Sequence, residues 1–142
     1  MDKRFAVLPC NGLDKAYGQL SREIALAIAE GTGSEVVCPV LLNTLQARYE
    51  KTLSGLPLLV VDGCQTRCAT KLANKLGIKI DQKILVSDAA KEAGTPLDKS
   101  PRLDPAALKL AEEIAAGFLA GPEKEVPVAD SSAEFDAPVE FT

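Results

Sequence analysis

Short apolar runs alternate along the chain with longer segments in which apolar residues recur every three or four positions. The short runs, at residues 5–9, 34–38, 57–62 and 78–86, have the length of strands. The run at 57–62 contains four consecutive aliphatic residues, which is typical of a central parallel strand buried on both faces. The pattern therefore predicts four strands, with 57–62 near the middle of the sheet.

Helical periodicity occupies the segments between and after these runs. Residues 14–30, 41–53 and 66–76 are predicted helices. A last helix is expected to begin with Asp104 as its cap and Pro105 in its first position, and to end before residue 121. Its predicted core-facing residues are Leu108, Ala111, Ile114, Ala115 and Phe118.

Strands that alternate with helices are the signature of βαβ units. We therefore predict an α/β fold: a single three-layer doubly wound (Rossmann/flavodoxin-like) domain with a mainly parallel four-stranded sheet in the order 2-1-3-4. The domain is expected over residues 1–121. Residues 122–142 are acidic and contain proline, which predicts a solvated tail. An alternative is that their apolar residues lie on this domain or on a neighbouring subunit, so the tail is a candidate contact for a protein partner or a homodimer.

Composition narrows the class of protein. The chain has 142 residues, of which 46% are hydrophobic, enough for one globular domain with its own core. The net charge of −4 argues against nucleic acid and anionic membranes as partners. We find no stretch of about 18 apolar residues, and the first apolar run is too short for a signal peptide. These features predict a cytoplasmic protein.

Four cysteines are the main chemical feature of the chain. Cys10, Cys38 and Cys64 each stand at or just past the end of a predicted strand, and Cys68 follows four residues later. Because the carboxyl ends of parallel strands meet at one edge of a sheet, we expect the four thiols to converge. We further expect Cys64 and Cys68 to lie one turn apart at a helix N-terminus, where the helix dipole lowers thiol pKa values.

Three kinds of site use such a set of thiols. A zinc ion held by Cys10, Cys38, Cys64 and Cys68 would be fully four-coordinate, which suits a structural or carried metal. An iron-sulfur cluster or another redox metal centre could use the same four ligands. A thiol-dependent enzyme could use Cys64 as nucleophile with Cys68 or Cys10 as the resolving thiol. The chain contains no histidine, so a Cys-His dyad and a Ser-His-Asp triad are excluded, and whether the protein is an enzyme stays open.

Other polar residues stand close to these cysteines in the sequence. Asp62 is a candidate general base or a hydrogen-bond acceptor behind the metal ligands, although an aspartate before glycine most often caps a helix or forms a turn. Arg67 could pair with an anionic ligand or offset a thiolate, or simply be solvated. Ser87 and Asp88 would line the same rim if the predicted strand order holds.

The segment Val61-Asp-Gly-Cys-Gln-Thr-Arg-Cys-Ala-Thr-Lys71, together with the two earlier cysteines, resembles the DGC family, which takes its name from the triplet found here at Asp62-Gly63-Cys64. The resemblance covers roughly residues 5–90. It implies a small zinc-binding domain with four chelating cysteines, which correspond to Cys10, Cys38, Cys64 and Cys68, and it implies no particular reaction. The serine expected beside the first cysteine in the family is replaced here by Asn11.

Overall fold

A computed structural model describes residues 4–12, 15–94 and 102–120. Within these ranges one parallel sheet contains β1 (Ala6–Pro9), β2 (Glu35–Val36), β3 (Leu58–Asp62) and β4 (Gln82–Leu85), in the order β2-β1-β3-β4. The predicted α/β class and strand order are therefore confirmed. The predicted tail at 122–142 lies outside the described residues, so the division into domain and tail stays a prediction.

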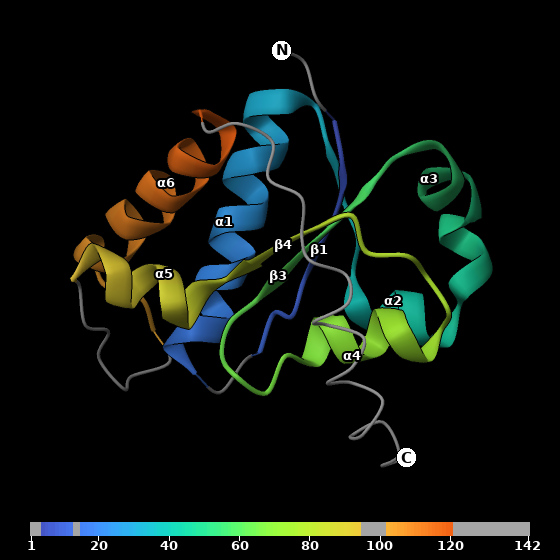
Figure 1. Ribbon diagram of the computed structural model, residues 1–142, viewed down its shortest axis with the longest axis horizontal. Helices are drawn as coiled ribbons and strands as arrows, with labels where there is room; N and C mark the ends of the chain where they lie inside the picture. The colour runs from blue at the N-terminus through green and yellow to red at the C-terminus, as the bar shows by residue number, and fades with distance from the viewer. Residues whose placement is uncertain (1–3, 13–14, 95–101, 121–142) are drawn as a thin grey trace.

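The register of the sheet places the ends of β1 and β3 at the same level. Pro9 pairs with Val61, so Cys10 lies beside Asp62, and the Cys10 amide donates to the Val61 carbonyl over 2.9 Å. The chain leaves β1 toward one face of the sheet and leaves β3 toward the other, as Figure 1 shows. Functional groups in doubly wound folds gather at this kind of strand junction.

One face of the sheet, here called the α1 face, is covered by α1 (Ala16–Thr32), α5 (Val86–Ala93) and α6 (Pro105–Ala120) (Figure 1). The apolar positions of α1 recur at helical spacing, so Leu20, Ile24 and Ile28 form one stripe and are fully buried. They pack with Val7, Leu59 and Val61 from the sheet and with one side of α6. This cluster is the larger of the two buried cores described.

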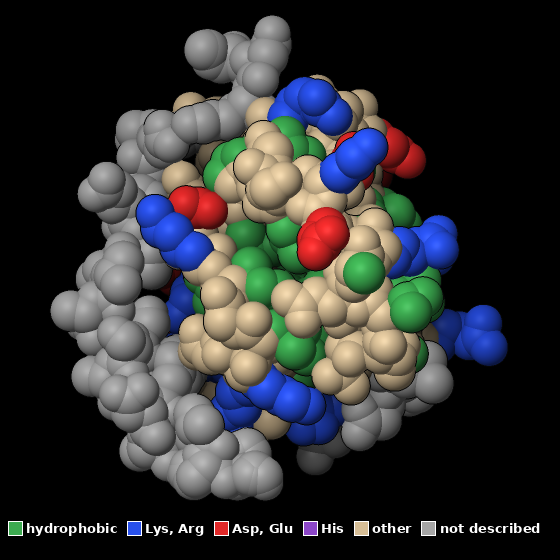
Figure 2. All heavy atoms as spheres, turned by 90° about the vertical axis from the view of Figure 1, so that its right-hand side faces the viewer, with side chains coloured by type: hydrophobic (Ala, Val, Ile, Leu, Met, Phe, Trp, Pro, Cys, Tyr) green, Lys and Arg blue, Asp and Glu red, His purple; other side chains and the backbone are tan. Residues whose placement is uncertain are grey.

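The opposite face, here called the α4 face, carries α2 (Pro39–Thr44), a 3-10 turn (Gln46–Tyr49), α3 (Glu50–Gly55) and α4 (Cys68–Lys75). Its core contains Leu8, Val60 and Leu42, but many neighbouring apolar side chains are only partly buried. Figure 2 shows apolar side chains in the middle of this side of the molecule, with Lys and Arg side chains around the edge. Helices on both faces of the sheet give the three predicted layers.

Several helix boundaries differ from the prediction. The expected helix 41–53 is interrupted at Leu45, whose dihedrals of −144° and 62° are not helical, so α2 and α3 are separate. The helix expected from residue 66 begins at Cys68, because Arg67 adopts a left-handed conformation with φ 54°. The helix α5 directly after β4 was not predicted.

The start of α6 follows the prediction, since Asp104 accepts a hydrogen bond from the Ala107 amide over 2.9 Å. Its predicted buried stripe is partly wrong. Leu108 is 41% exposed, whereas Leu110 is 2% exposed and packs in the core. None of the described helices is long and apolar enough to cross a membrane.

Candidate functional site

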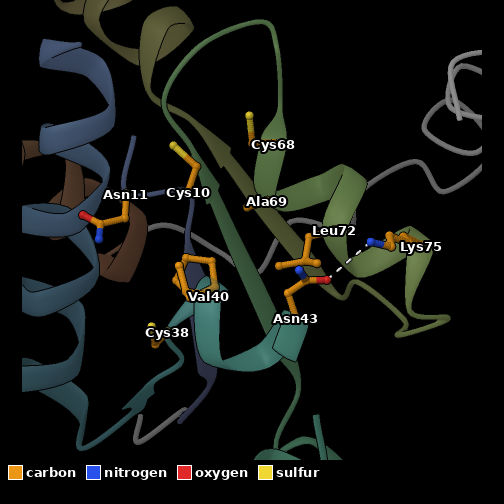
Figure 3. Close-up of a pocket in the computed structure, with 10 residues that line it drawn as sticks. Cys10, Asn11, Cys38, Val40, Asn43, Cys68, Ala69, Leu72 and Lys75 are labelled. Carbon is orange, nitrogen blue, oxygen red and sulfur yellow. Dashed lines mark hydrogen bonds between the residues drawn. The ribbon is translucent and has the colours of Figure 1, made fainter. Parts of the chain in front are cut away.

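A cavity of about 350 Å³ opens between α2 and α4 at the carboxyl edge of the sheet. Cys10, Cys38 and Cys68 line it, and we refer to it as the cysteine cavity (Figure 3). Cys10 enters it from the end of β1 and Cys68 from the first residue of α4. Three of the four cysteines therefore line one cavity on the α4 face, where the covering helices are short.

Cys10 is held by hydrogen bonds from two directions. The Gly63 amide, in the loop after β3, donates to Cys10 Sγ over 3.3 Å. On the other side Cys10 Sγ lies 3.6 Å from Ser21 Oγ, which is buried on α1. The Ser21 hydroxyl donates to the Gly18 carbonyl and accepts from the Asn11 amide, so its remaining capacity is to accept from the Cys10 thiol. A hydroxyl thus contacts the first cysteine even though Asn11 replaces the expected serine.

Sequence reasoning did not identify Ser21. A signal was present, because Ser21 follows Leu20 directly and precedes Ile24 by three residues, on the side of the helix that packs on the sheet. A serine at such a position needs a hydrogen-bond partner once it is buried. Only the packing of α1 beside the end of β1 shows that the partners of Ser21 are the Cys10 thiol and the Asn11 amide.

Asp62 caps α4 from the end of the preceding strand. Its buried carboxylate accepts hydrogen bonds from the amides of Ala69 at 2.8 Å and Thr70 at 3.3 Å, and from the Thr70 hydroxyl. Burial raises the pKa of Asp62, and the hydrogen bonds from Thr70 and Ala69 offset part of that effect. The helix-cap interpretation is confirmed, and this cap fixes the helix on which Cys68 is the first residue.

Gly63 lies against the start of α1. A Cβ atom added at Gly63 would stand 2.7 Å from the Tyr17 carbonyl oxygen and 2.9 Å from the Gly18 nitrogen, distances that side chains do not tolerate. The same close packing recurs at Gly18, where an added Cβ would be 2.2 Å from the Gly12 carbonyl oxygen. Glycine at position 63 therefore lets the loop come near enough to donate to Cys10.

Cys64 begins a turn rather than a helix. Its carbonyl accepts from the Arg67 amide over 3.0 Å, and Arg67 supplies the left-handed residue before α4. The prediction that Cys64 and Cys68 both lie at a helix N-terminus, one helical turn apart, is wrong for Cys64. Cys64 is the first residue of this turn, and Cys68 follows it as the first residue of α4.

The prediction of a lowered thiol pKa is also wrong for Cys68. Partial burial raises the pKa of Cys68, and negative charge on Cys10, Asp62 and Cys64 raises it further, whereas Lys71 lowers it. The pKa of Cys68 is therefore raised even though this residue is the first of α4. The same interactions place Cys10 and Cys64 within electrostatic range of Cys68.

Cys38 lies apart from this group. It precedes α2, and its amide donates to the Tyr49 hydroxyl over 3.1 Å. In Figure 3, Val40 stands between Cys38 and Cys10. No group of three or more Cys, Asp or Glu side chains in the described residues stands at metal-binding spacing. Cys10, Cys38 and Cys68 line the same cavity, whereas Cys64 is not among its lining residues.

Ser87 and Asp88 support the loop after β3 and are not among the residues that line the cysteine cavity. The Ser87 amide donates to the Gly63 carbonyl over 3.0 Å, and Asp88 accepts from the Gln65 amide group over 3.3 Å. Lys75 of α4 and Asn43 of α2 also line the cavity, and sequence reasoning did not assign either of them to the site. Lys75 donates to the side chain of Asn43 over 3.4 Å.

A comparison with protein-family models identifies a DGC domain over residues 6–116. The match extends past the segment that carries the resemblance and includes most of α6. No curated protein and no solved structure gives a significant match.

Proposed function

The chain belongs to the DGC domain family, and we propose that it binds a zinc ion through the thiolates of Cys10, Cys64 and Cys68, with Cys38 as a further candidate ligand. The main support for the proposal is that the Asp62-Gly63-Cys64 triplet makes hydrogen bonds that position two other cysteines, Cys10 and Cys68. Asp62 caps the helix that begins at Cys68, and the Gly63 amide donates to Cys10 Sγ.

The donor set fits a thiophilic metal ion. Thiolates are preferred ligands of zinc, and the chain has no histidine to compete as a ligand. The nearby carboxylate of Asp62 is occupied by the cap of α4. A backbone amide that donates to a thiolate sulfur is a typical interaction of the residues behind metal ligands, and Gly63 supplies one to Cys10.

The charges around Cys68 also favour the binding of a metal cation. Negative charge on Cys10, Asp62 and Cys64 raises the pKa of Cys68 in the metal-free chain, after the effect of burial. A divalent cation among these groups would reverse that effect and stabilise the thiolates. The raised pKa disfavours the thiolate form of Cys68 in the metal-free chain, which argues against Cys68 as an activated resolving thiol.

The test is elemental analysis, an absorption spectrum and a thiol count on the full chain, purified without oxygen and without an affinity-tag metal. We expect about one zinc per chain, no visible colour and protected thiols. Cys64→Ser and Cys68→Ser should lose zinc, whereas Cys38→Ser separates a three-thiol site, which keeps zinc, from a four-thiol site, which loses affinity. Iron with visible absorbance would favour a redox centre, and four reactive thiols without metal would contradict metal binding.

A further inference from the structure

The acidic excess of the chain lies entirely in its tail, residues 122–142. The tail contains six Asp and Glu against one Lys, whereas residues 1–121 contain fourteen Asp and Glu against fifteen Lys and Arg. The tail also contains five large apolar side chains, those of Val126, Val128, Phe135, Val139 and Phe141. A segment with both carboxylates and spaced apolar residues matches a surface that is apolar and cationic.

A surface of this kind lies on α2 and α4. Val40 and Leu45, at either end of α2, are 68% and 53% exposed, the highest values among the large apolar side chains that the structure describes. Leu72 of α4 lines the cysteine cavity together with Val40 (Figure 3). Lys71 and Lys75 flank Leu72 on the same helix. We refer to these five residues as the α2–α4 surface.

The cations of the α2–α4 surface lie in a part of the chain without carboxylates. Residues 67–80 contain four Lys and Arg and no Asp or Glu. Lys75 is exposed and donates to the neutral amide of Asn43 at 3.4 Å, a long hydrogen bond. None of the ten residues that line the cysteine cavity is Asp or Glu. A carboxylate brought to Lys75 would form a charge-assisted hydrogen bond, which is stronger than the contact to an amide.

We propose that the tail binds to the α2–α4 surface of its own chain. Its valine and phenylalanine side chains lie on Val40, Leu45 and Leu72, and its carboxylates lie beside Lys71 and Lys75. Because Val40, Leu72 and Lys75 also line the cysteine cavity, the bound tail lies across that side of the cavity. The interaction requires no metal ion, so the inference does not depend on the proposed function.

The tail is long enough to reach this surface. The end of α6 lies beside the end of α1, because a Cβ atom added at Gly31 would be 3.6 Å from Leu119 Cδ1. The chain from Gly31 to Val40 spans at most roughly 30 Å, whereas a tail of 21 residues spans up to roughly 70 Å. Linkage to the domain also gives the tail an effective concentration of about millimolar, so weak contacts with the surface are sufficient.

The test is carbodiimide cross-linking of the full chain, which joins a carboxylate to a lysine as an amide. Ordinary and nitrogen-15-labelled protein are mixed in equal amounts, so that mass spectrometry distinguishes links within one chain from links between chains. We expect the tail to be linked to Lys71 and Lys75 within one chain. Lys91 of α5 and Lys109 of α6, on the α1 face, should be linked several-fold less often. Most links should disappear in about 1 M salt, where the Debye length is about 3 Å.

A tail variant tests the apolar contacts. Phe135→Ser combined with Phe141→Ser should reduce the links to Lys71 and Lys75 several-fold, because it removes two large apolar side chains. Ser131→Ala, in the same segment, is the matched control and should leave these links unchanged. Circular dichroism checks that both variants are folded.

The other outcomes overturn the inference. Equal linking of the tail to all four lysines, or no linking at all, shows that the tail does not bind this surface. Links between chains alone show that the surface binds the tail of a second copy. Undiminished linking in the double phenylalanine variant overturns the apolar contacts. Each of these results is independent of the zinc content of the protein, so it leaves the proposed function intact.

Discussion

The two faces of the sheet are built differently, and the difference explains where the cysteines lie. The α1 face is covered by helices of 17, 8 and 16 residues and contains fifteen buried residues in one cluster. The α4 face is covered by helices of 6, 6 and 8 residues and contains eight buried residues, surrounded by as many partly buried ones. Long helices close one face, and short helices leave the cysteine cavity open on the other.

Strand alternation assigns each residue at the end of β1 and β3 to one of these faces. Leu8 and Val60 pack on the α4 face, whereas Val7 and Val61 pack on the α1 face. Cys10 and Asp62, two residues beyond Leu8 and Val60, therefore share the α4 face. We therefore expect stability to depend mainly on the α1 face and metal binding on the α4 face. Substitutions on each face can test this separation.

The largest effect is expected from the core of the α1 face. Ile24→Ala removes a fully buried side chain and should lower the free energy of unfolding by about 2–5 kcal/mol. Leu72→Ala, on the partly buried side of α4, should cost only about 1 kcal/mol. Urea denaturation measures both, and the zinc content of folded Ile24→Ala protein should stay unchanged. A larger loss of unfolding free energy in Leu72→Ala than in Ile24→Ala would contradict the expectation that stability depends mainly on the α1 face.

Gly63→Ala should affect both stability and the site. The added Cβ overlaps the Tyr17 and Gly18 backbone, which predicts a loss of about 1–3 kcal/mol and a displaced hydrogen bond to Cys10, with weaker zinc binding. Gly117→Ala is the control, because an added Cβ there meets no atom within 4 Å in α6. It should stabilise the protein by about 0.5–1 kcal/mol. Unfolding midpoints and zinc affinity would be compared, and equal behaviour of the two variants would contradict the role of Gly63.

Two helix caps of the same residue type lie on opposite faces. Asp62→Ala removes the cap of α4, and Asp104→Ala removes the cap of α6, so each should lower stability by about 0.5–2 kcal/mol. Only Asp62→Ala should reduce zinc affinity, because α4 carries Cys68. Competition with a chelator measures this affinity. Equal zinc affinity of the two variants would show that the cap of α4 does not support the site.

The smallest effect is the pH dependence contributed by Asp62. Because burial raises its pKa above the unfolded value of about 3.9, the folded chain binds more protons in this range than the unfolded chain. The contribution of Asp62 to stability is therefore full below about pH 4 and declines as pH rises through the raised pKa. Urea denaturation of metal-free wild type and Asp62→Asn across this range should show the decline in the wild type only. A stability difference that grows in favour of the wild type as pH rises would contradict the assigned direction.

The fold could be predicted because local patterns suffice for it. Aliphatic runs and helical stripes in this chain identify the four strands and the helices α1 and α6, and their alternation implies a parallel sheet. The start of α4 was missed because Arg67 takes a left-handed conformation that its residue type does not indicate. Within the predicted stripe of α6, Leu108 was wrong and Leu110 was missed, because an alanine-rich helix gives a weak stripe.

The sequence by itself determined that the chain has four thiols and no histidine, and that Cys10, Cys38 and Cys64 follow strands at the carboxyl edge of the sheet. The tertiary structure decided which groups meet. Ser21 and Cys10 are eleven residues apart, Gly63 and Cys10 are fifty-three apart, and Lys75 and Asn43 are thirty-two apart. Contacts over such separations depend on helix packing and strand register, because no local pattern specifies which side chain another element brings into contact.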